Sequence, residues 1–268
     1  MSFHDLPKAS WLDLVRYVDS TLASERYADP RRLSRFGRKV YSQCDEDGLL
    51  ARIFELIGTT DQSFLEFGVG DGRECNSVWL LHQGWRGVWL EADPSDVRRM
   101  QTTHEHWLRS GALRIVQARV SAETIDRVIA EAGLPAEIDL LSIDIDYNDY
   151  WVWKAITRTS PRVVCIEYNA TWPPPASIVV PYDPTRSWSG DNHFGASLAA
   201  LAGLGAQKGY RLVGCSLSGV NAFFVRADLC GDRFVAPGCA QTHYEPARYF
   251  LTELPSGHPA GIGETLQV

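Results

Sequence analysis

The sequence predicts an α/β fold in which a mostly parallel sheet carries helices on both faces. Apolar runs of strand length alternate with helix-like segments from about residue 41 to residue 226, and this alternation is typical of parallel strands joined by helices. The first apolar run ends in closely spaced glycines that lead into a helix. Seven strand runs are present, and the last two form a hairpin around a Ser-Gly turn.

Two helices are expected before the first strand. Residues 11–28 place apolar side chains at helical spacing, so we expect an amphipathic helix that packs on the core, closes over a substrate or forms a contact between subunits. Residues 29–39 are polar and basic and indicate a loop. The segment 41–58 then has a continuous apolar face, with Ser42 and Asp45 as candidate N-caps.

Residues 63–93 form the most informative stretch of the chain. A strand run is followed by a glycine turn, a helix and a second strand that ends on Glu91. The turn consists of one acid and three glycines: Glu66, Gly68, Gly70 and Gly72. Glycines allow a backbone to approach a ligand closely, a helix N-terminus offers free N–H groups, and an acid about 20 residues on accepts ribose hydroxyls. The stretch therefore predicts a pocket for a nucleoside.

The glycine spacing indicates which nucleoside. Dinucleotides are bound by G-x-G-x-x-G, whereas here the third glycine comes one position early and Arg73 takes its place, which argues against NAD. The acid followed by G-x-G-x-G resembles the first motif of class I S-adenosylmethionine (SAM)-dependent methyltransferases. By that resemblance the fold is a Rossmann-like seven-stranded sheet with its last strand antiparallel and inserted, Glu66 and the glycine loop hold the methionine end of SAM, and Glu91 holds the ribose.

A second motif narrows the resemblance. The S-Q-x-x-E-D-G sequence at residues 42–48, together with S-I-D-I-D, I-E-Y-N and G-V-N-A-F-F-V further on, resembles FkbM-type methyltransferases and extends the similarity from Tyr41 to about Arg226. The resemblance implies that Gln43 and Asp47 reach the SAM methionine or the substrate. The alternative is a capping cluster with no ligand.

Three more elements are expected after Glu91. They are a helix over residues 95–109, a strand at 113–120 and a helix at 122–132. The end of that strand should approach the adenine, so Arg119 is expected beside the base.

Acidic and amide side chains end the next two strand runs. The run 138–150 carries Asp144 and Asp146, and the run 162–169 carries Glu167 and Asn169. Because ligands bind at the carboxyl ends of parallel strands, we expect these groups to share one crevice. Oxygen ligands of this kind suit Mg²⁺, and metal-dependent O-methyltransferases, which the sequence resembles here, imply Asp144, Glu167 and Asn169 as its ligands. Alternatively, Asp144 and Asp146 bind the SAM amino group or cap the next helix.

The long loop 170–194 is rich in proline and aromatic residues and lacks any helical or strand period, which is typical of lids and binding loops. Trp172, Tyr182 and Trp188 are candidates to line an acceptor pocket. His193 is a candidate general base with Asp191 to orient it, although single histidines are more often structural or exposed. With Asp144, these two form the expected catalytic set.

Three regions are expected along the chain: an N-terminal helical extension (1–40), the methyltransferase domain (41–230) and a C-terminal arm (231–268). The formal net charge of −7 disfavours nucleic acid as a partner and favours a small-molecule acceptor. The sequence has no secretory signal and no apolar stretch of about 20 residues, so we expect a cytoplasmic protein without a membrane partner. Six scattered cysteines without C-x-x-C pairing indicate free thiols rather than a zinc site or disulfides.

The sequence thus predicts SAM-dependent methyl transfer, with Mg²⁺ as a candidate second cofactor and a homo-oligomer as a candidate assembly. The resemblance implies O-methylation of a hydroxyl on a sugar or secondary metabolite. Methylation of a small amine and SAM binding without catalysis are the alternatives. An amide nitrogen is disfavoured as acceptor because no N-P-P-Y sequence follows the fourth strand.

Overall fold

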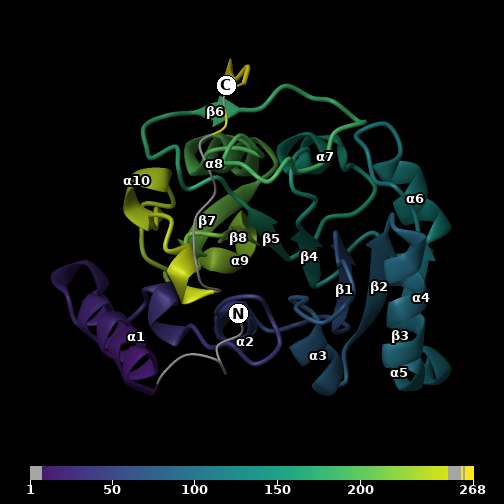
Figure 1. Cartoon of the computed structure of the whole chain (residues 1–268), viewed down its shortest axis with the longest axis horizontal. Helices are drawn as coiled ribbons and strands as arrows, with labels where there is room; N and C mark the ends of the chain where they lie inside the picture. Colours follow the sequence, from purple (N-terminus) through teal and green to yellow (C-terminus); the bar gives the residue numbers. More distant parts are fainter. Residues whose placement is uncertain (1–7, 253–260, 262) are drawn as a thin grey trace.

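The computed structural model describes residues 8–252, 261 and 263–268 (Figure 1). Its centre is a seven-stranded sheet in the order β3-β2-β1-β4-β5-β8-β7. The strands are β1 (Ser63–Phe67), β2 (Arg86–Glu91), β3 (Leu113–Gln117), β4 (Leu140–Ile143), β5 (Val163–Glu167), β7 (Tyr210–Cys215) and β8 (Asn221–Arg226). Strands β1 to β5 are parallel, whereas β8 lies antiparallel between β5 and β7. The predicted fold class, with its inserted antiparallel strand, is confirmed.

Helices cover both faces of the sheet and enclose two apolar cores (Figure 1). One face carries α6 (Ile125–Glu131), α7 (Asp149–Ala155) and α8 (Leu198–Gln207), and the other carries α2 (Glu46–Ile57), α3 (Val78–His82), α4 (Pro94–Thr103) and α5 (Glu105–Ser110). Successive side chains of a strand point to opposite faces, and in β1 Leu65 joins the first core while Phe64 joins the second. Both are fully buried, so protein atoms cover β1 on both faces of the sheet.

Several elements are shorter than the sequence predicts. The N-terminal helix α1 covers Lys8–Leu22 rather than 11–28, and a 3₁₀ turn, η2 (Glu25–Tyr27), follows it. The helix expected at 95–109 is two helices, α4 and α5, separated at His104. The His104 ring is buried and its Nε2 lies 3.1 Å from the Gly72 carbonyl, so the break between the helices is tied to the glycine loop.

The loop 170–194 contains a short strand that the sequence does not predict. Within it, β6 (Ile178–Val179) pairs with β9 (Leu266–Gln267) near the C-terminus. A pair of two-residue strands has no detectable period, and its partners are far apart in the chain. The remaining short elements are η3 (Leu33–Phe36), α9 (Ala227–Cys230), α10 (Ala240–His243) and η4 (Tyr249–Leu251).

The two expected terminal regions meet at one buried carboxylate. Glu245, in the C-terminal arm, is 1% exposed. Its Oε2 accepts hydrogen bonds from Tyr27 Oη at 2.6 Å and from Arg248 Nη1 at 2.9 Å, and its carbonyl accepts one from Tyr168 Oη, just beyond β5, at 2.6 Å. The arm is therefore packed on the domain at this point. Residues 1–7 of the extension and residues 253–260 and 262 of the arm lie outside the described residues.

No helix in the described part of the chain combines the length and apolar character that crossing a membrane requires.

Candidate functional site

The glycine loop leaves β1 at the carboxyl edge of the sheet and is built around two close approaches. Gly68 has φ +79°, and a Cβ atom on it would lie 1.4 Å from the Asp144 carbonyl oxygen. Gly72 has φ +81°, and a Cβ atom there would lie 2.8 Å from Met100 Cγ. Only glycine fits such positions without displacing its neighbours, so the motif first fixes the path of the backbone.

Glu66 joins β1 to the helix after the loop. Its Oε1 accepts from the Asn76 N–H at 2.7 Å, and its Oε2 accepts from the Ser77 N–H at 3.0 Å and the Ser77 hydroxyl at 2.5 Å. The side chain is 5% exposed, and burial raises the pKa of its carboxyl group despite these donors. Glu66 therefore shapes the loop directly, while also lining one of the cavities described below.

Glu91 ends β2 and faces the same loop. Its Oε2 accepts from the Gly70 N–H at 2.9 Å, and its Oε1 accepts from the N–H groups of Ala92 at 2.7 Å and Asp93 at 2.9 Å. These bonds hold the carboxylate at the mouth of the glycine loop, where the predicted ribose site lies.

Two cavities lie along this edge of the sheet. We call the larger, of about 330 Å³, the Glu91 cavity, since Glu91, Ala118, Arg119 and Val120 are among its walls. The smaller, of about 230 Å³, is the Glu66 cavity, with Gln43, Glu66, Asn76 and Asn221 among its walls. Gly68, Gly70 and Asp144 line both. The two cavities therefore flank the glycine loop.

Part of the loop 170–194 covers the Glu91 cavity. Pro184, Arg186 and Ser187 line it. Arg119 donates from Nε to the Pro184 carbonyl at 3.3 Å and from Nη2 to the Thr185 carbonyl at 3.0 Å, so its guanidinium group is used to fasten the loop. Arg119 is thus beside the predicted base site, but its charged end points to the loop.

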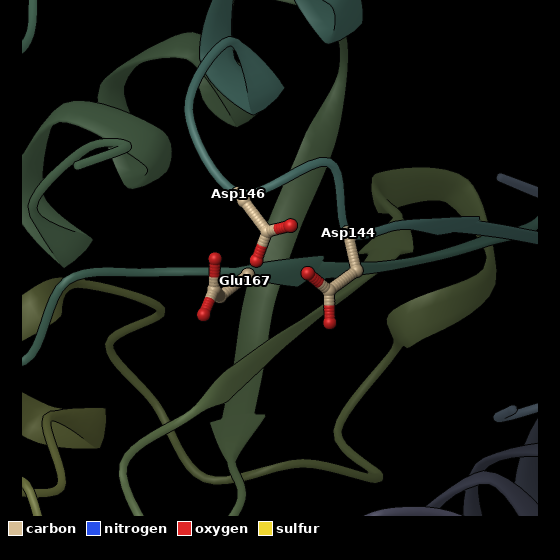
Figure 2. A group of neighbouring side chains, drawn as sticks. All are labelled: Asp144, Asp146 and Glu167. Atoms are coloured by element: carbon tan, nitrogen blue, oxygen red, sulfur yellow. The ribbon is translucent and has the colours of Figure 1, made fainter. Parts of the chain in front are cut away.

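Three carboxyl groups meet next to the glycine loop, at the ends of β4 and β5. One oxygen from each of Asp144, Asp146 and Glu167 lies within 4.8 Å of the others. Figure 2 shows Asp146 reaching from the loop after β4 toward the other two. Asp146 has φ +65°, a conformation that costs a non-glycine residue about 1–3 kcal/mol and that clusters at functional sites. We call this group the carboxylate cluster.

The carboxylate cluster is poorly solvated and mutually repulsive. Burial, followed by the nearby Asp146 and Asp149 carboxylates, raises the pKa of Asp144 well above its ordinary value. Burial and then Asp144 do the same for the pKa of Glu167. Asp146 is an exposed residue, and partial desolvation of its carboxyl group raises its pKa too. Among the described residues, no ion pair joins any of the three to a basic side chain.

The cluster opens into a third cavity of about 150 Å³, the carboxylate cavity. Its other walls are mostly aromatic or apolar: Trp188, Phe194, Val220 and Tyr249, with Gln43 and Thr252. Asp144 lines all three cavities, Gln43 lines the Glu66 and carboxylate cavities, and Asp146 lines the Glu91 and carboxylate cavities. Asp144 is therefore the side chain on which the whole site converges.

Asp146 lies with Asp144 and Glu167, whereas the amide of the expected ligand Asn169 is bonded to the loop 170–194. Asn169 is fully buried, and its Nδ2 donates to the carbonyls of Asn192 at 2.8 Å and Phe194 at 3.0 Å. Its Oδ1 accepts from the Thr171 N–H and hydroxyl. Both ends of the amide are used to anchor the two ends of the loop 170–194, so the side chain has no oxygen directed at the cluster.

His193 and Asp191 are not arranged as a base and its orienting acid. Asp191 Oδ1 accepts from the backbone N–H of His193 at 2.9 Å, whereas the His193 ring Nε2 lies 2.9 Å from the Glu264 carbonyl. Neither residue lines any of the three cavities. The pair instead joins the end of the loop to the C-terminal segment.

The S-Q-x-x-E-D-G segment contains the capping cluster that the sequence offers as an alternative, and Gln43 within it lines two cavities. Asp47 is buried, and its Oδ2 accepts from the backbone N–H groups of Val40, Tyr41 and Ser42 at 2.6–3.0 Å. Asp47 thus holds the turn, and the turn presents Gln43 between the Glu66 and carboxylate cavities.

Sequence reasoning missed two lining residues. Asn221, in the Glu66 cavity, pairs directly with Glu167 across β8 and β5, and the predicted hairpin register was the signal that would have placed it at this edge. Tyr249, in the carboxylate cavity, comes from the C-terminal arm, and no local pattern indicates its position.

Comparisons with known proteins agree with this architecture. The family model described as "Methyltransferase FkbM domain" matches residues 49–212, well over half of the chain. No curated protein matches the sequence significantly. Among solved structures, the N-terminal domain of EvdMO1 with SAH bound is 14% identical, with 84% of this chain and 98% of that chain covered and a TM-score of 0.43.

Two further solved structures show a similar level of likeness. An O-methyltransferase from Bacillus cereus in complex with SAH is 15% identical, with 62% of this chain and 69% of that chain covered and a TM-score of 0.35. A TehB-like SAM-dependent methyltransferase from Corynebacterium glutamicum is 15% identical, with 80% and 98% covered and a TM-score of 0.42.

Proposed function

The chain belongs to the FkbM methyltransferase family, a family of SAM-dependent enzymes, and we propose that it transfers the methyl group of SAM to a hydroxyl oxygen of a small molecule. The observation that carries the proposal is the position of Asp144, which lines the two cavities beside the glycine loop and the carboxylate cavity. Methyl donor and acceptor would therefore meet at this side chain.

The two cavities beside the glycine loop are assigned to SAM. The Glu91 carboxylate accepts ribose hydroxyls, and Arg119 and Val120 flank the adenine. The Glu66 cavity receives the methionine end, where Gln43 and Asn221 offer amide groups. This division follows the family motif, in which the acid after the second strand and the glycine loop act on opposite ends of the same ligand.

The carboxylate cluster fits a divalent cation. Three carboxyl groups supply the hard oxygen ligands that Mg²⁺ prefers, and their repulsion at less than 4.8 Å has no basic partner among the described residues to offset it. We therefore assign Asp144, Asp146 and Glu167 as ligands of Mg²⁺. When bound there, Mg²⁺ would orient an acceptor hydroxyl and lower its pKa.

The protein's own task is alignment and proton removal. A sulfonium methyl group is already activated, so the acceptor oxygen must lie in line with it and lose its proton. We assign proton uptake to Asp144, because within the carboxylate cluster only Asp144 also lines the Glu66 cavity. Trp188 and Phe194 would hold the apolar faces of the acceptor.

The preference of Mg²⁺ for oxygen ligands favours a hydroxyl over an amine as acceptor. A hydroxyl oxygen would bind the ion and lose its proton more readily there, whereas an amine nitrogen is a poorer ligand for Mg²⁺. Sugars and hydroxylated secondary metabolites are therefore the acceptor class that we propose.

The test is a screen of hydroxylated and amine acceptors with SAM and Mg²⁺, read by mass spectrometry as a gain of about 14 daltons per methyl group. We expect hydroxylated acceptors to be modified, EDTA to abolish the reaction and Mg²⁺ to restore it. Products confined to amines, or turnover unchanged by EDTA, would contradict the hydroxyl and metal assignments respectively. Calorimetric titration with SAM and NAD provides the control for the cofactor.

A further inference from the structure

A fourth cavity lies beneath helix α1, next to the site but outside it. We call this the α1 cavity; its volume of about 460 Å³ is the largest of the four. Its walls are largely aliphatic, with Leu14, Val15, Val18 and Leu22 of α1 on one side and Leu217 and Leu251 on the other. Helix α1 thus directs its apolar stripe at a hollow rather than at closely packed protein atoms.

One wall of the α1 cavity contains an incompletely paired carboxyl group. Asp45 Oδ2 accepts from the Leu217 N–H at 3.1 Å, whereas its Oδ1 is buried and has no hydrogen-bond partner among the described residues. A buried oxygen of this kind is costly to leave without a donor. An apolar hollow beside it suits a molecule with an aliphatic body and a hydroxyl or other donor.

The α1 cavity and the carboxylate cavity are lined by neighbouring residues of the same three segments, although no described residue lines both. Gln43 lines the carboxylate cavity, and its neighbour Cys44 lines the α1 cavity. The turn before β8 contributes Ser218 to the α1 cavity and Val220 to the carboxylate cavity. The segment around η4 divides in the same way, with Leu251 in the α1 cavity and the nearby Tyr249 and Thr252 in the carboxylate cavity.

Helix α1 covers the α1 cavity and is held to the C-terminal arm through Tyr17. Tyr17 accepts a hydrogen bond at its Oη from Arg248 Nε at 3.1 Å and packs edge-on against Phe250, with ring centroids 5.2 Å apart. Leu12 on the same helix is 53% exposed. An aliphatic ligand beneath α1 would supply the packing that the helix lacks on its inner side.

We infer that the α1 cavity binds the aliphatic portion of an amphiphilic acceptor whose hydroxylated head lies in the carboxylate cavity. This inference rests on the proposed function for the identity of the head group, because the carboxylate cavity is assigned there to the reacting hydroxyl. The acceptor would carry an alkyl or acyl chain, and helix α1 would select for that chain.

The first experiment tests whether the α1 cavity binds aliphatic chains, independently of methyl transfer. Binding of n-alkanols from butanol to decanol is measured by calorimetry on the full-length protein. Each buried methylene should strengthen binding about fourfold, the factor that corresponds to ~0.8 kcal/mol, until the chain fills the cavity. Val18→Trp, which fills the α1 cavity, should remove the chain-length dependence, and Leu14→Trp provides a second filling variant. Leu12→Trp, on the exposed side of the same helix, should retain it.

The second experiment tests the connection to the carboxylate cavity. In the n-alkyl β-D-glucosides from methyl to octyl, we expect affinity to rise with chain length and Val18→Trp to abolish the rise. Asp146→Asn should weaken the binding of octyl β-D-glucoside in Mg²⁺ and leave octanol binding unchanged. Titration with SAM on the same samples reports on the proposed function separately, because SAM occupies neither of these two cavities.

Absence of chain-length dependence in both series would overturn the inference, as would a dependence that persists in both Val18→Trp and Leu14→Trp. So would a filling variant that dissociates an oligomer in sedimentation while alkanol binding is unchanged, since the α1 cavity would then belong to an interface between copies of this chain. Alkanol binding that is blocked by Val18→Trp but not by Leu12→Trp would support it.

Discussion

The backbone of Gly68 crosses that of Asp144 so closely that a Cβ atom on the glycine would lie 1.4 Å from the Asp144 carbonyl oxygen. The contact joins the loop after β1 to the loop after β4, and Asp144 N–H donates to the Phe67 carbonyl at 3.2 Å beside it. The glycine motif and the carboxylate cluster are consequently parts of one structure, and a displacement of either displaces the other.

Gly68→Ala should therefore destabilise the protein more than Gly70→Ala. Both positions have positive φ, but a Cβ atom on Gly70 meets nothing within 4 Å. We expect a cost of about 1–2 kcal/mol for the backbone conformation at either site and about 1–3 kcal/mol more at Gly68 for displacing Asp144. Thermal unfolding measures the difference, as roughly 2–4 °C per kcal/mol. Equal melting temperatures would contradict the close approach.

Glu91→Ala should weaken SAM binding. The change removes an ionised acceptor for the ribose hydroxyls and releases the Gly70 N–H that Glu91 now holds. Bonds to charged groups contribute about 1.5–3 kcal/mol, so affinity in calorimetric titration should fall roughly 10- to 100-fold. Glu131→Ala, at an exposed site on α6, is the matched control and should bind SAM as the wild type does.

Asp146→Asn should reduce the response of the protein to Mg²⁺. One of three candidate ligands loses its charge, while the amide keeps the size of the side chain. In the wild type, Mg²⁺ should raise the melting temperature because binding to the folded state alone stabilises it. The variant should need a markedly higher Mg²⁺ concentration for the same rise. An identical Mg²⁺ dependence would remove Asp146 from the ligand set.

His193→Ala should leave most of the turnover intact. The His193 ring lies against the Glu264 carbonyl and outside the carboxylate cavity, so it is not placed to take a proton from an acceptor there. Loss of a general base lowers rates about 10²- to 10⁴-fold, and we expect Asp144→Asn to show a loss of this size. A comparable loss in His193→Ala, at unchanged melting temperature, would restore the histidine as the base.

The contribution of the Asp45 carboxyl group to the free energy of unfolding should fall as the pH rises. Burial, then the neighbouring Glu46 carboxylate, raises the pKa of Asp45 to about 7. A carboxyl group whose folded-state pKa exceeds its unfolded value near 4 binds more protons in the folded state, so its contribution is present below about pH 4 and is lost as the pH rises toward 7.

The melting temperature of the wild type should accordingly fall between pH 5 and pH 8 more than that of Asp45→Asn. Burial also raises the pKa of Asp149 to about 7. The effect of Asp149 on the pH dependence of stability is the same in both proteins, so it cancels in the comparison. Parallel curves for the wild type and Asp45→Asn would show that the Asp45 carboxyl group titrates normally.

The sheet and the cofactor side of the site could be predicted from sequence because their signals are local. Strand runs alternate with helices at short range, and the glycine loop, Glu66 and Glu91 lie within 26 residues of one another in fixed order. The hydrogen bonds from Glu66 to the start of the next helix and from Glu91 to the glycine loop act over those same distances, so the motif specifies the turn and its immediate surroundings.

The acceptor side could not be predicted in the same way because its contacts are distant in sequence. Asn169 looks like a metal ligand until its amide is found bonded to Asn192 and Phe194. Tyr249 reaches the carboxylate cavity from the C-terminal arm. Asp146 joins Asp144 and Glu167 from a backbone with positive φ, a conformation that sequence patterns at an aspartate do not indicate.

The hydrogen bond from Tyr27 to Glu245 has a consequence for how the protein is made on the ribosome. Its two residues are 218 positions apart, so the N-terminal extension leaves the ribosome long before its partner exists. Contacts of such long range form late and slow the final steps of folding. Until the last part of the chain has been translated, the Tyr27 hydroxyl has no Glu245 to bind, and the N-terminal extension lacks this anchor to the C-terminal arm.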